Sequence, residues 1–148
     1  GRTSEGFGED TYLVSRIAEV MVKAFQGTSP ANADSLMASV KHFALYGAVE
    51  GGRDYNVVDM SPMRMYQDYL PPYRAAIDAG AGGVMVALNA INGVPASANS
   101  WLLRDLLRRS ARPCSRNHGL SDCKIRVFAA PQMEIGPQSA RNDGDNEK

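Results

Sequence analysis

Residues 83–88 read Gly-Val-Met-Val-Ala-Leu, and this run decides the fold class because it contains no polar side chain. A strand with one face in water alternates apolar and polar residues, whereas a strand covered on both faces does not alternate. Strands buried on both faces belong mostly to parallel sheets whose two faces are covered by other elements. We therefore predict a buried strand at residues 83–88.

Helical and strand-like segments alternate on both sides of this run. Residues 36–43 are a short, mostly apolar strand candidate. Apolar side chains recur at helical spacing after a cap at Asp10 or Thr11. The same spacing returns in residues 61–79, where two prolines interrupt it, and in residues 101–108. Strands separated by helical segments predict an α/β fold with a parallel sheet.

The composition argues against several classes of partner. Sixteen basic and sixteen acidic residues cancel. This balance removes the electrostatic argument for a nucleic acid or an anionic membrane surface as a partner. No apolar run approaches the roughly 20 residues of a membrane-spanning helix. Cys114 and Cys123 match no metal-binding spacing.

The alternating pattern stops after Arg108. Residues 109–148 are largely polar and lack periodicity, and only residues 125–130 suit a short strand. Residues 138–148 contain no aliphatic side chain larger than alanine, which predicts disorder. We therefore divide the chain into an α/β part, residues 1–108, and an irregular or disordered C-terminal tail.

Four motifs in the α/β part carry a resemblance to a known family. Residues 1–10, G-R-T-S-E-G-F-G-E-D, resemble the pattern G-R-x-x-E-x-[FY]-[GS]-E-D. Residues 41–43 resemble K-H-F, and residues 84–95 resemble M-x-S-Y-N-x-I-N-G-x-P. Residues 101–108 resemble the helix that, in the same family, precedes the strand carrying the catalytic nucleophile. Together they resemble glycoside hydrolase family 3, most closely its periplasmic β-glucosidases.

This resemblance implies an incomplete portion of a TIM-like (β/α)₈ barrel, since a complete barrel needs about 250 residues. It also implies an internal fragment of a longer protein that is periplasmic or secreted. The reaction implied is retaining hydrolysis of terminal non-reducing β-D-glucosyl residues from a β-glucoside or oligosaccharide. This chemistry needs no metal and no other cofactor. The alternatives are a β-xylosidase or arabinofuranosidase of the same family, or a catalytically inactive truncated chain.

The resemblance further implies which residues contact the sugar. In the family, the arginine of G-R and the Lys-His pair of K-H-F bind sugar hydroxyls, and these positions are Arg2, Lys41 and His42. A sugar offers many hydroxyls and no charge, so well-placed donors fix its orientation. Leu88 stands where the family pattern has a tyrosine, and a ring contact with substrate is therefore lost there.

The catalytic carboxyl groups have no recognisable counterpart. The family nucleophile is the aspartate of an S-D motif that W-G-F precedes. Residues 121–122 are Ser-Asp, but neither an apolar strand nor W-G-F comes before them, so we do not expect Asp122 to be the nucleophile. The acidic residues Glu5, Glu9 and Asp10 are interpreted as a helix start. We assign no catalytic residue and expect the 148-residue chain itself to be inactive.

We infer that a frameshift, or an assembly or annotation error, lies close to codon 108, because the motifs and the periodicity stop together there. We therefore predict that the DNA for residues 95–148, read in the two neighbouring frames, encodes the W-G-F and S-D pattern. Re-sequencing this DNA and translating all frames checks the prediction. Absence of the pattern from every frame contradicts it.

Overall fold

A parallel sheet forms the centre of the computed structural model, which describes residues 2–29, 31–108 and 126–128. Its strands pair in the order β1 (Ser39–Phe43), β2 (Gly83–Val86) and β5 (Arg126–Phe128). The predicted buried strand is the central strand β2, where Val84 and Val86 are fully buried. The predicted α/β class is confirmed.

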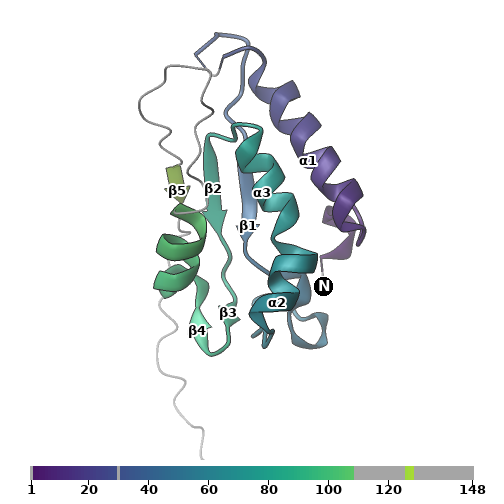
Figure 1. Ribbon diagram of the computed structural model, residues 1–148, viewed down its shortest axis with the longest axis vertical. Coiled ribbons are helices and arrows are strands. Elements are labelled where there is room, and N and C mark those ends of the chain that lie inside the picture. The colour runs from purple at the N-terminus through teal and green to yellow at the C-terminus, as the bar shows by residue number, and fades with distance from the viewer. Residues whose placement is uncertain (1, 30, 109–125, 129–148) are drawn as a thin grey trace, which may run out of the picture.

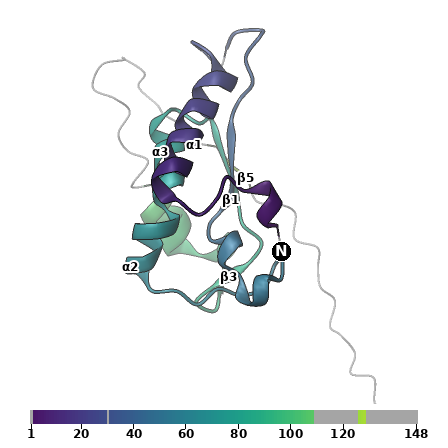
Figure 2. The same cartoon turned by 90° about the vertical axis from the view of Figure 1, so that its right-hand side faces the viewer.

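Helices cover one face of this sheet, as Figure 2 shows. Helix α1 (Thr11–Gln26) packs along α3 (Pro71–Asp78), and the two lie side by side in Figure 1. The remaining helical segments are α2 (Pro62–Arg64), which continues into η4 (Met65–Tyr69), the helix η6 (Trp101–Arg108), and the short turns η1 (Thr3–Glu5), η2 (Tyr46–Ala48), η3 (Glu50–Gly52) and η5 (Ala96–Ala98). None of the helices described is long and apolar enough to span a membrane.

Side-chain caps begin the three helical segments predicted from sequence. The acceptors are Asp10 for the Leu13 amide (2.7 Å), Ser61 for the Arg64 amide (3.3 Å) and Asn99 for the Leu102 amide (3.0 Å). Each cap satisfies an amide that has no partner within its own helix. The predicted helix starts are therefore confirmed, and Asp10, not Thr11, caps α1.

A hairpin that the sequence analysis did not predict follows β2. Strands β3 (Ala90–Ile91) and β4 (Val94–Pro95) pair antiparallel. The turn residues Asn92 and Gly93 have φ values of 49° and 80°, as a two-residue hairpin turn requires. Asn92 also exchanges two hydrogen bonds with the Met60 backbone, at 2.8 and 3.0 Å. The hairpin is thereby tied to the segment that enters α2.

Strand β5 lies within the predicted irregular tail. The short strand expected at residues 125–130 is confirmed for residues 126–128, which pair with β2 in parallel. Val127 packs against the main core cluster, whereas Phe128 stays 42% exposed. Asp122, Cys114 and Cys123 lie outside the described residues.

Part of the exposed surface of α1 is apolar in this structure. Leu13, Val20 and Phe25 are exposed, and within the described residues β1 pairs only with β2. In a closed barrel such strand edges and apolar helix faces are covered by neighbouring units. The described residues therefore have the features of a barrel portion.

One buried side chain connects α1 to the entrances of both main strands. Gln26, the last residue of α1, is only 6% exposed. Its Nε2 donates to the Gly80 carbonyl (2.8 Å), and its Oε1 accepts from the amides of Ala38 (3.1 Å) and Gly82 (3.0 Å). These residues precede β1 and β2, so Gln26 fixes where both strands begin.

Replacing Gln26 by leucine removes these partners while keeping a side chain of similar size. Because an unpaired buried polar group costs about 1–3 kcal/mol, we expect Gln26→Leu to lower the free energy of unfolding by about 2–4 kcal/mol. Urea unfolding followed by circular dichroism measures the change. Gln67→Leu, at an exposed position of η4, is the control and should stay within about 0.5 kcal/mol. An equal decrease in the free energy of unfolding in both variants would contradict the structural role of Gln26.

Candidate functional site

The three residues predicted to contact a sugar lie near the carboxyl end of β1. Lys41 and His42 belong to β1 itself, and Arg2 immediately precedes η1. Figure 1 shows the N-terminal residues beside the end of the sheet to which β1 and β2 run. Barrel active sites assemble at this end of the strands. The three residues therefore lie at the end of the sheet where a barrel active site is expected.

The ring of Tyr46 joins two of these residues. The His42 and Tyr46 ring centroids are 4.7 Å apart at an interplanar angle of 67°. The Arg2 guanidinium carbon lies 5.8 Å from the centroid of the same ring. Arg2 and His42, which are far apart in sequence, thus share one aromatic neighbour. The sequence analysis did not single out Tyr46, although it follows the Lys-His-Phe motif closely.

Two carboxylates accompany Arg2. Its guanidinium forms a two-pronged ion pair with Glu5, at 2.7 Å (Nε to Oε1) and 2.6 Å (Nη2 to Oε2). Asp54 lies 3.7 Å from Nη1. The hydrogen bond from Arg2 lowers the pKa of Glu5, and the same bond raises the pKa of Arg2. The interpretation of Glu5 as part of the helix start is wrong, because Glu5 pairs with Arg2 and Asp10 makes the cap.

His42 is buried and held in the neutral form. It is 8% exposed, and its Nδ1 has no hydrogen-bond partner within the described residues. Burial lowers its pKa below the ordinary 6.5, and the positive charges of Lys41 and Arg2 lower it further. A neutral imidazole keeps one nitrogen as an acceptor and one as a donor, which suits a hydroxyl partner.

The backbone of His42 is anchored by helix α3. The Tyr73 hydroxyl donates to the His42 carbonyl oxygen at 2.6 Å. The Tyr73 ring also meets the Phe43 ring edge-on, with centroids 5.1 Å apart. Burial raises the pKa of the Tyr73 hydroxyl, so it remains a donor at neutral pH. Tyr73 therefore holds the end of β1 against the helix layer.

The segment after β2 contributes one exposed residue, Leu88, and one buried residue, Asn89. Leu88, which replaces the tyrosine of the family pattern, is 46% exposed. Asn89 is 1% exposed, donates to the Ala44 carbonyl (3.4 Å), and has an Oδ1 without a partner in the described residues. The Asn89 bond crosses from β2 to the segment after β1, so the two strand ends are linked.

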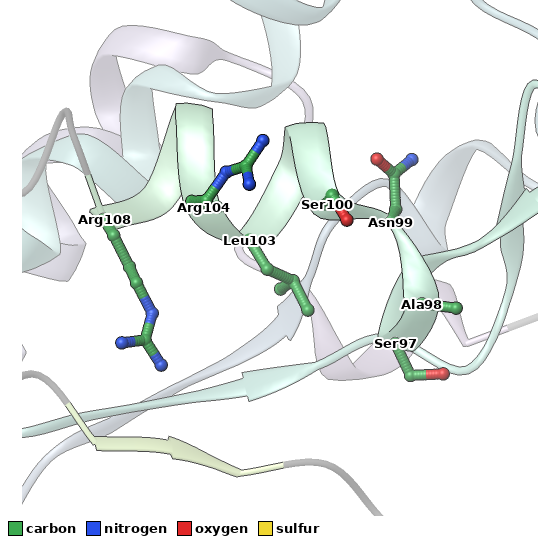
Figure 3. A pocket seen from close by; sticks show the side chains of 7 residues that line it. All are labelled: Ser97, Ala98, Asn99, Ser100, Leu103, Arg104 and Arg108. Carbon is green, nitrogen blue, oxygen red and sulfur yellow. The ribbon is translucent and has the colours of Figure 1, made fainter.

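A separate hollow of about 340 Å³ lies on η5 and η6 (Figure 3). Its lining residues are Ser97, Ala98, Asn99, Ser100, Leu103, Arg104 and Arg108. None of the predicted sugar-contacting residues borders it. In the described part of the chain, no three histidine, cysteine or acidic residues gather as metal ligands would. The candidate nucleophile Asp122 is outside the described residues, and it precedes β5 in the chain, whereas barrel catalytic residues follow their strands.

The lowered pKa of His42 predicts a pH effect on stability. As the pH falls through 6.5, the unfolded chain binds a proton on His42 that the folded chain does not bind. The free energy of unfolding should therefore fall with the pH, until the native pKa of His42 is passed. NMR titration of the histidine ring protons measures this pKa directly, and we expect a midpoint below 6.5.

The chain has two histidines, so the control variant His118→Gln assigns the remaining signal to His42. A midpoint at or above 6.5 for His42 would contradict both its burial and the nearby positive charges.

Comparison with known proteins identifies the family of this chain. The family model "Glycosyl hydrolase family 3 N terminal domain" matches residues 1–112. A periplasmic β-glucosidase of Salmonella typhimurium is 67% identical over 108 residues, covering 73% of this chain and 14% of that protein. A β-xylosidase of Formosa agariphila is 42% identical over 111 residues, covering 73% and 15%.

Solved structures show the same likeness. The crystal structure of a β-glucosidase from Listeria innocua matches with a TM-score of 0.72 and 48% identity, over 75% of this chain and 16% of that chain. The Listeria enzyme has also been solved in complex with glucose. This chain therefore spans only 14% and 16% of the length of the Salmonella and Listeria relatives. From the family match and these identities, we conclude that the chain belongs to glycosyl hydrolase family 3 and represents part of its barrel-like N-terminal domain.

Proposed function

We propose that this chain is part of a retaining β-glucosidase in which Arg2, Lys41 and His42 hold the glucosyl residue. The observation that carries the proposal is the meeting of Arg2 and His42 on the Tyr46 ring, next to Lys41 at the end of β1. The Salmonella relative is a periplasmic β-glucosidase, and the Listeria relative has been solved with glucose. These relatives favour a terminal glucosyl unit as the ligand.

The charges at the site favour a neutral, hydroxyl-rich ligand. Arg2 and Lys41 are positive, Glu5 and Asp54 are negative, and His42 is neutral because its pKa is lowered. The formal charges therefore cancel at neutral pH, while donors and acceptors remain. Forked and point donors of this kind fix the orientation of sugar hydroxyls. Such contacts also strengthen as the glycosidic bond breaks.

A second sugar is favoured by one observation, the 42% identity with the Formosa β-xylosidase. A β-xyloside has the ring hydroxyls of a glucoside but lacks its hydroxymethyl group. Contacts with the shared hydroxyls therefore do not separate the two substrates. The higher identity with the Salmonella β-glucosidase favours the glucoside.

We assign neither carboxyl group of the retaining mechanism to a described residue. That mechanism needs a nucleophile and an acid/base about 5 Å apart on opposite sides of the scissile bond. Glu5 is tied to Arg2 and its pKa is lowered, so it is a poor proton donor. We therefore infer that the described residues bind and orient the sugar, and that the 148-residue chain alone does not hydrolyse it. A periplasmic location is inferred from the Salmonella relative.

A chimera tests the sugar-binding roles. Residues 1–108 would replace the matching segment of the Salmonella β-glucosidase, and we expect the chimera to hydrolyse 4-nitrophenyl β-D-glucoside faster than the β-D-xyloside. Arg2→Ala, Lys41→Ala and His42→Ala should each lower kcat/KM roughly 10- to 100-fold, the effect of losing a hydrogen bond to a charged or buried group. Steady-state kinetics on both substrates measures these effects.

The controls Lys23→Ala and Arg64→Ala remove exposed cations from α1 and α2, and should stay within about twofold. An active chimera whose site variants behave like these controls would refute the sugar-binding roles. Preference for the xyloside would select the alternative substrate, and hydrolysis by the purified 148-residue chain would refute its inferred inactivity.

A further inference from the structure

Tyr46 contacts both Arg2 and His42. Its ring meets the His42 ring edge-on, with centroids 4.7 Å apart. The Arg2 guanidinium lies over the ring at 5.8 Å from its centroid, within cation–π range. A leucine at this position would supply apolar volume but no aromatic face. The aromatic ring is therefore the feature that both neighbours share.

The backbone before Tyr46 is fixed in an uncommon conformation. Leu45 has a φ of 68° and a ψ of 15°, the left-handed region that a branched side chain rarely adopts. Its side chain is 2% exposed, and its carbonyl accepts from the Ala48 amide at 2.9 Å. Such a conformation persists only where the surroundings enforce it, and it concentrates near functional sites. The buried Leu45 therefore sets the direction in which the chain presents Tyr46.

Arg2 needs an anchor outside its own segment. Its strongest ion pair is with Glu5, which belongs to the same N-terminal segment and moves with it. Two contacts join Arg2 to the loop after β1: the Tyr46 ring, and Asp54 at 3.7 Å, near the limit of an ion pair. Of these, only Tyr46 also contacts His42. The position of Arg2 relative to His42 therefore depends on Tyr46.

We propose that Tyr46 is a positioning residue: its ring fixes the position of the Arg2 guanidinium relative to the His42 imidazole, so that both side chains can contact the same sugar. The identity of the ligand rests on the function proposed above, whereas the placement of the two side chains does not. The competing role is that of a core filler, because Tyr46 also packs against the main core cluster. If Tyr46 only fills the core, leucine at this position should leave the position of Arg2 and the pKa of His42 unchanged. If Tyr46 is a positioning residue, leucine should change both.

Two variants of the full 148-residue chain separate these roles. Tyr46→Phe keeps the ring and removes the hydroxyl, whereas Tyr46→Leu keeps apolar volume and removes the ring. NMR of the sugar-free protein should show contacts between the Tyr46 ring protons and both Arg2 and His42. The Arg2 side-chain protons should be shifted upfield by the ring in the wild type and in Tyr46→Phe. In Tyr46→Leu this shift disappears with the ring itself, so the position of Arg2 is measured there from proton contacts between Arg2 and Asp54, which we expect to be lost.

The pKa of His42 gives a second measurement from the same samples. The groups that act on it are Lys41 of β1, Arg2 and Glu5 of the N-terminal segment, and Asp54 of the loop after η3, while Tyr73 of α3 stays neutral beside its carbonyl. Burial is the main cause of the lowered pKa of His42, and leucine keeps most of this burial, but the positive charge of Arg2 is a further cause that weakens when Arg2 loses its contact with the ring. We expect Tyr46→Leu to raise this pKa toward 6.5 and Tyr46→Phe to leave it unchanged.

Arg2–Asp54 contacts and a His42 pKa that are the same in both variants would overturn the proposal and leave Tyr46 as a core filler. Absence of Tyr46 contacts to Arg2 or His42 in the wild type would also overturn it, even where Tyr46→Leu fails to fold. Because no sugar is present in these NMR measurements, chimera site variants that behave like the controls refute the proposed function without affecting this result. The two failures are therefore distinguishable.

Discussion

The parallel pairing of β1 with the buried strand β2 is the constraint on which the site depends. Phe43 lies opposite Val86, and the Ala87 amide donates to the Phe43 carbonyl at 2.6 Å. Since both strands run in the same direction, whatever follows each strand emerges at one edge. The loop that carries Tyr46 and the segment that carries Leu88 therefore lie at the same end of the sheet. Shifting this register would separate them.

At this end of the sheet, the buried polar residues and the charged residues lie on different sides. The inner side holds His42 and Asn89, each with a buried polar atom that has no partner in the described residues. The outer side holds Arg2, Glu5 and Asp54, whose ion pairs are partly exposed to water. Exposed ion pairs contribute little to stability, but they restrict where a guanidinium lies. The inner side therefore supplies hydrogen-bonding atoms at a cost in stability, and the outer side supplies orientation.

Local signals in the sequence predicted local structure well. Asp10, Ser61 and Asn99 cap helices because each cap bonds an amide only three residues ahead. The Asn92–Gly93 turn carries an equally local hairpin signal, although these two residues also belong to the family motif at residues 84–95. The first strand was predicted to begin at residue 36, but β1 begins at Ser39. Leu36 and Met37 are exposed, so their apolar character does not reflect burial within the sheet.

Contacts between distant segments could not be predicted in this way. Arg2, Lys41 and His42 were identified through a family resemblance, and no spacing rule connects residue 2 with residue 42. The roles of Tyr46, Tyr73 and Gln26 depend on partners in other elements, so only the fold reveals them. The pairing of Glu5 with Arg2 was missed for a different reason. An acidic residue near a helix start has a simpler local interpretation, and that interpretation competed with the ion pair.

The ion pair between Arg2 and Glu5 makes Glu5 unsuited to a catalytic role in the proposed reaction. A general acid must hold its proton near the working pH, which requires a raised carboxyl pKa. Arg2 has the opposite effect on Glu5, since its hydrogen bonds lower the pKa and occupy both carboxylate oxygens. A nucleophile must leave an oxygen free to attack the anomeric carbon. Glu5 meets neither condition, and its function here is to hold Arg2, so the hydrolytic step needs carboxyl groups other than this one.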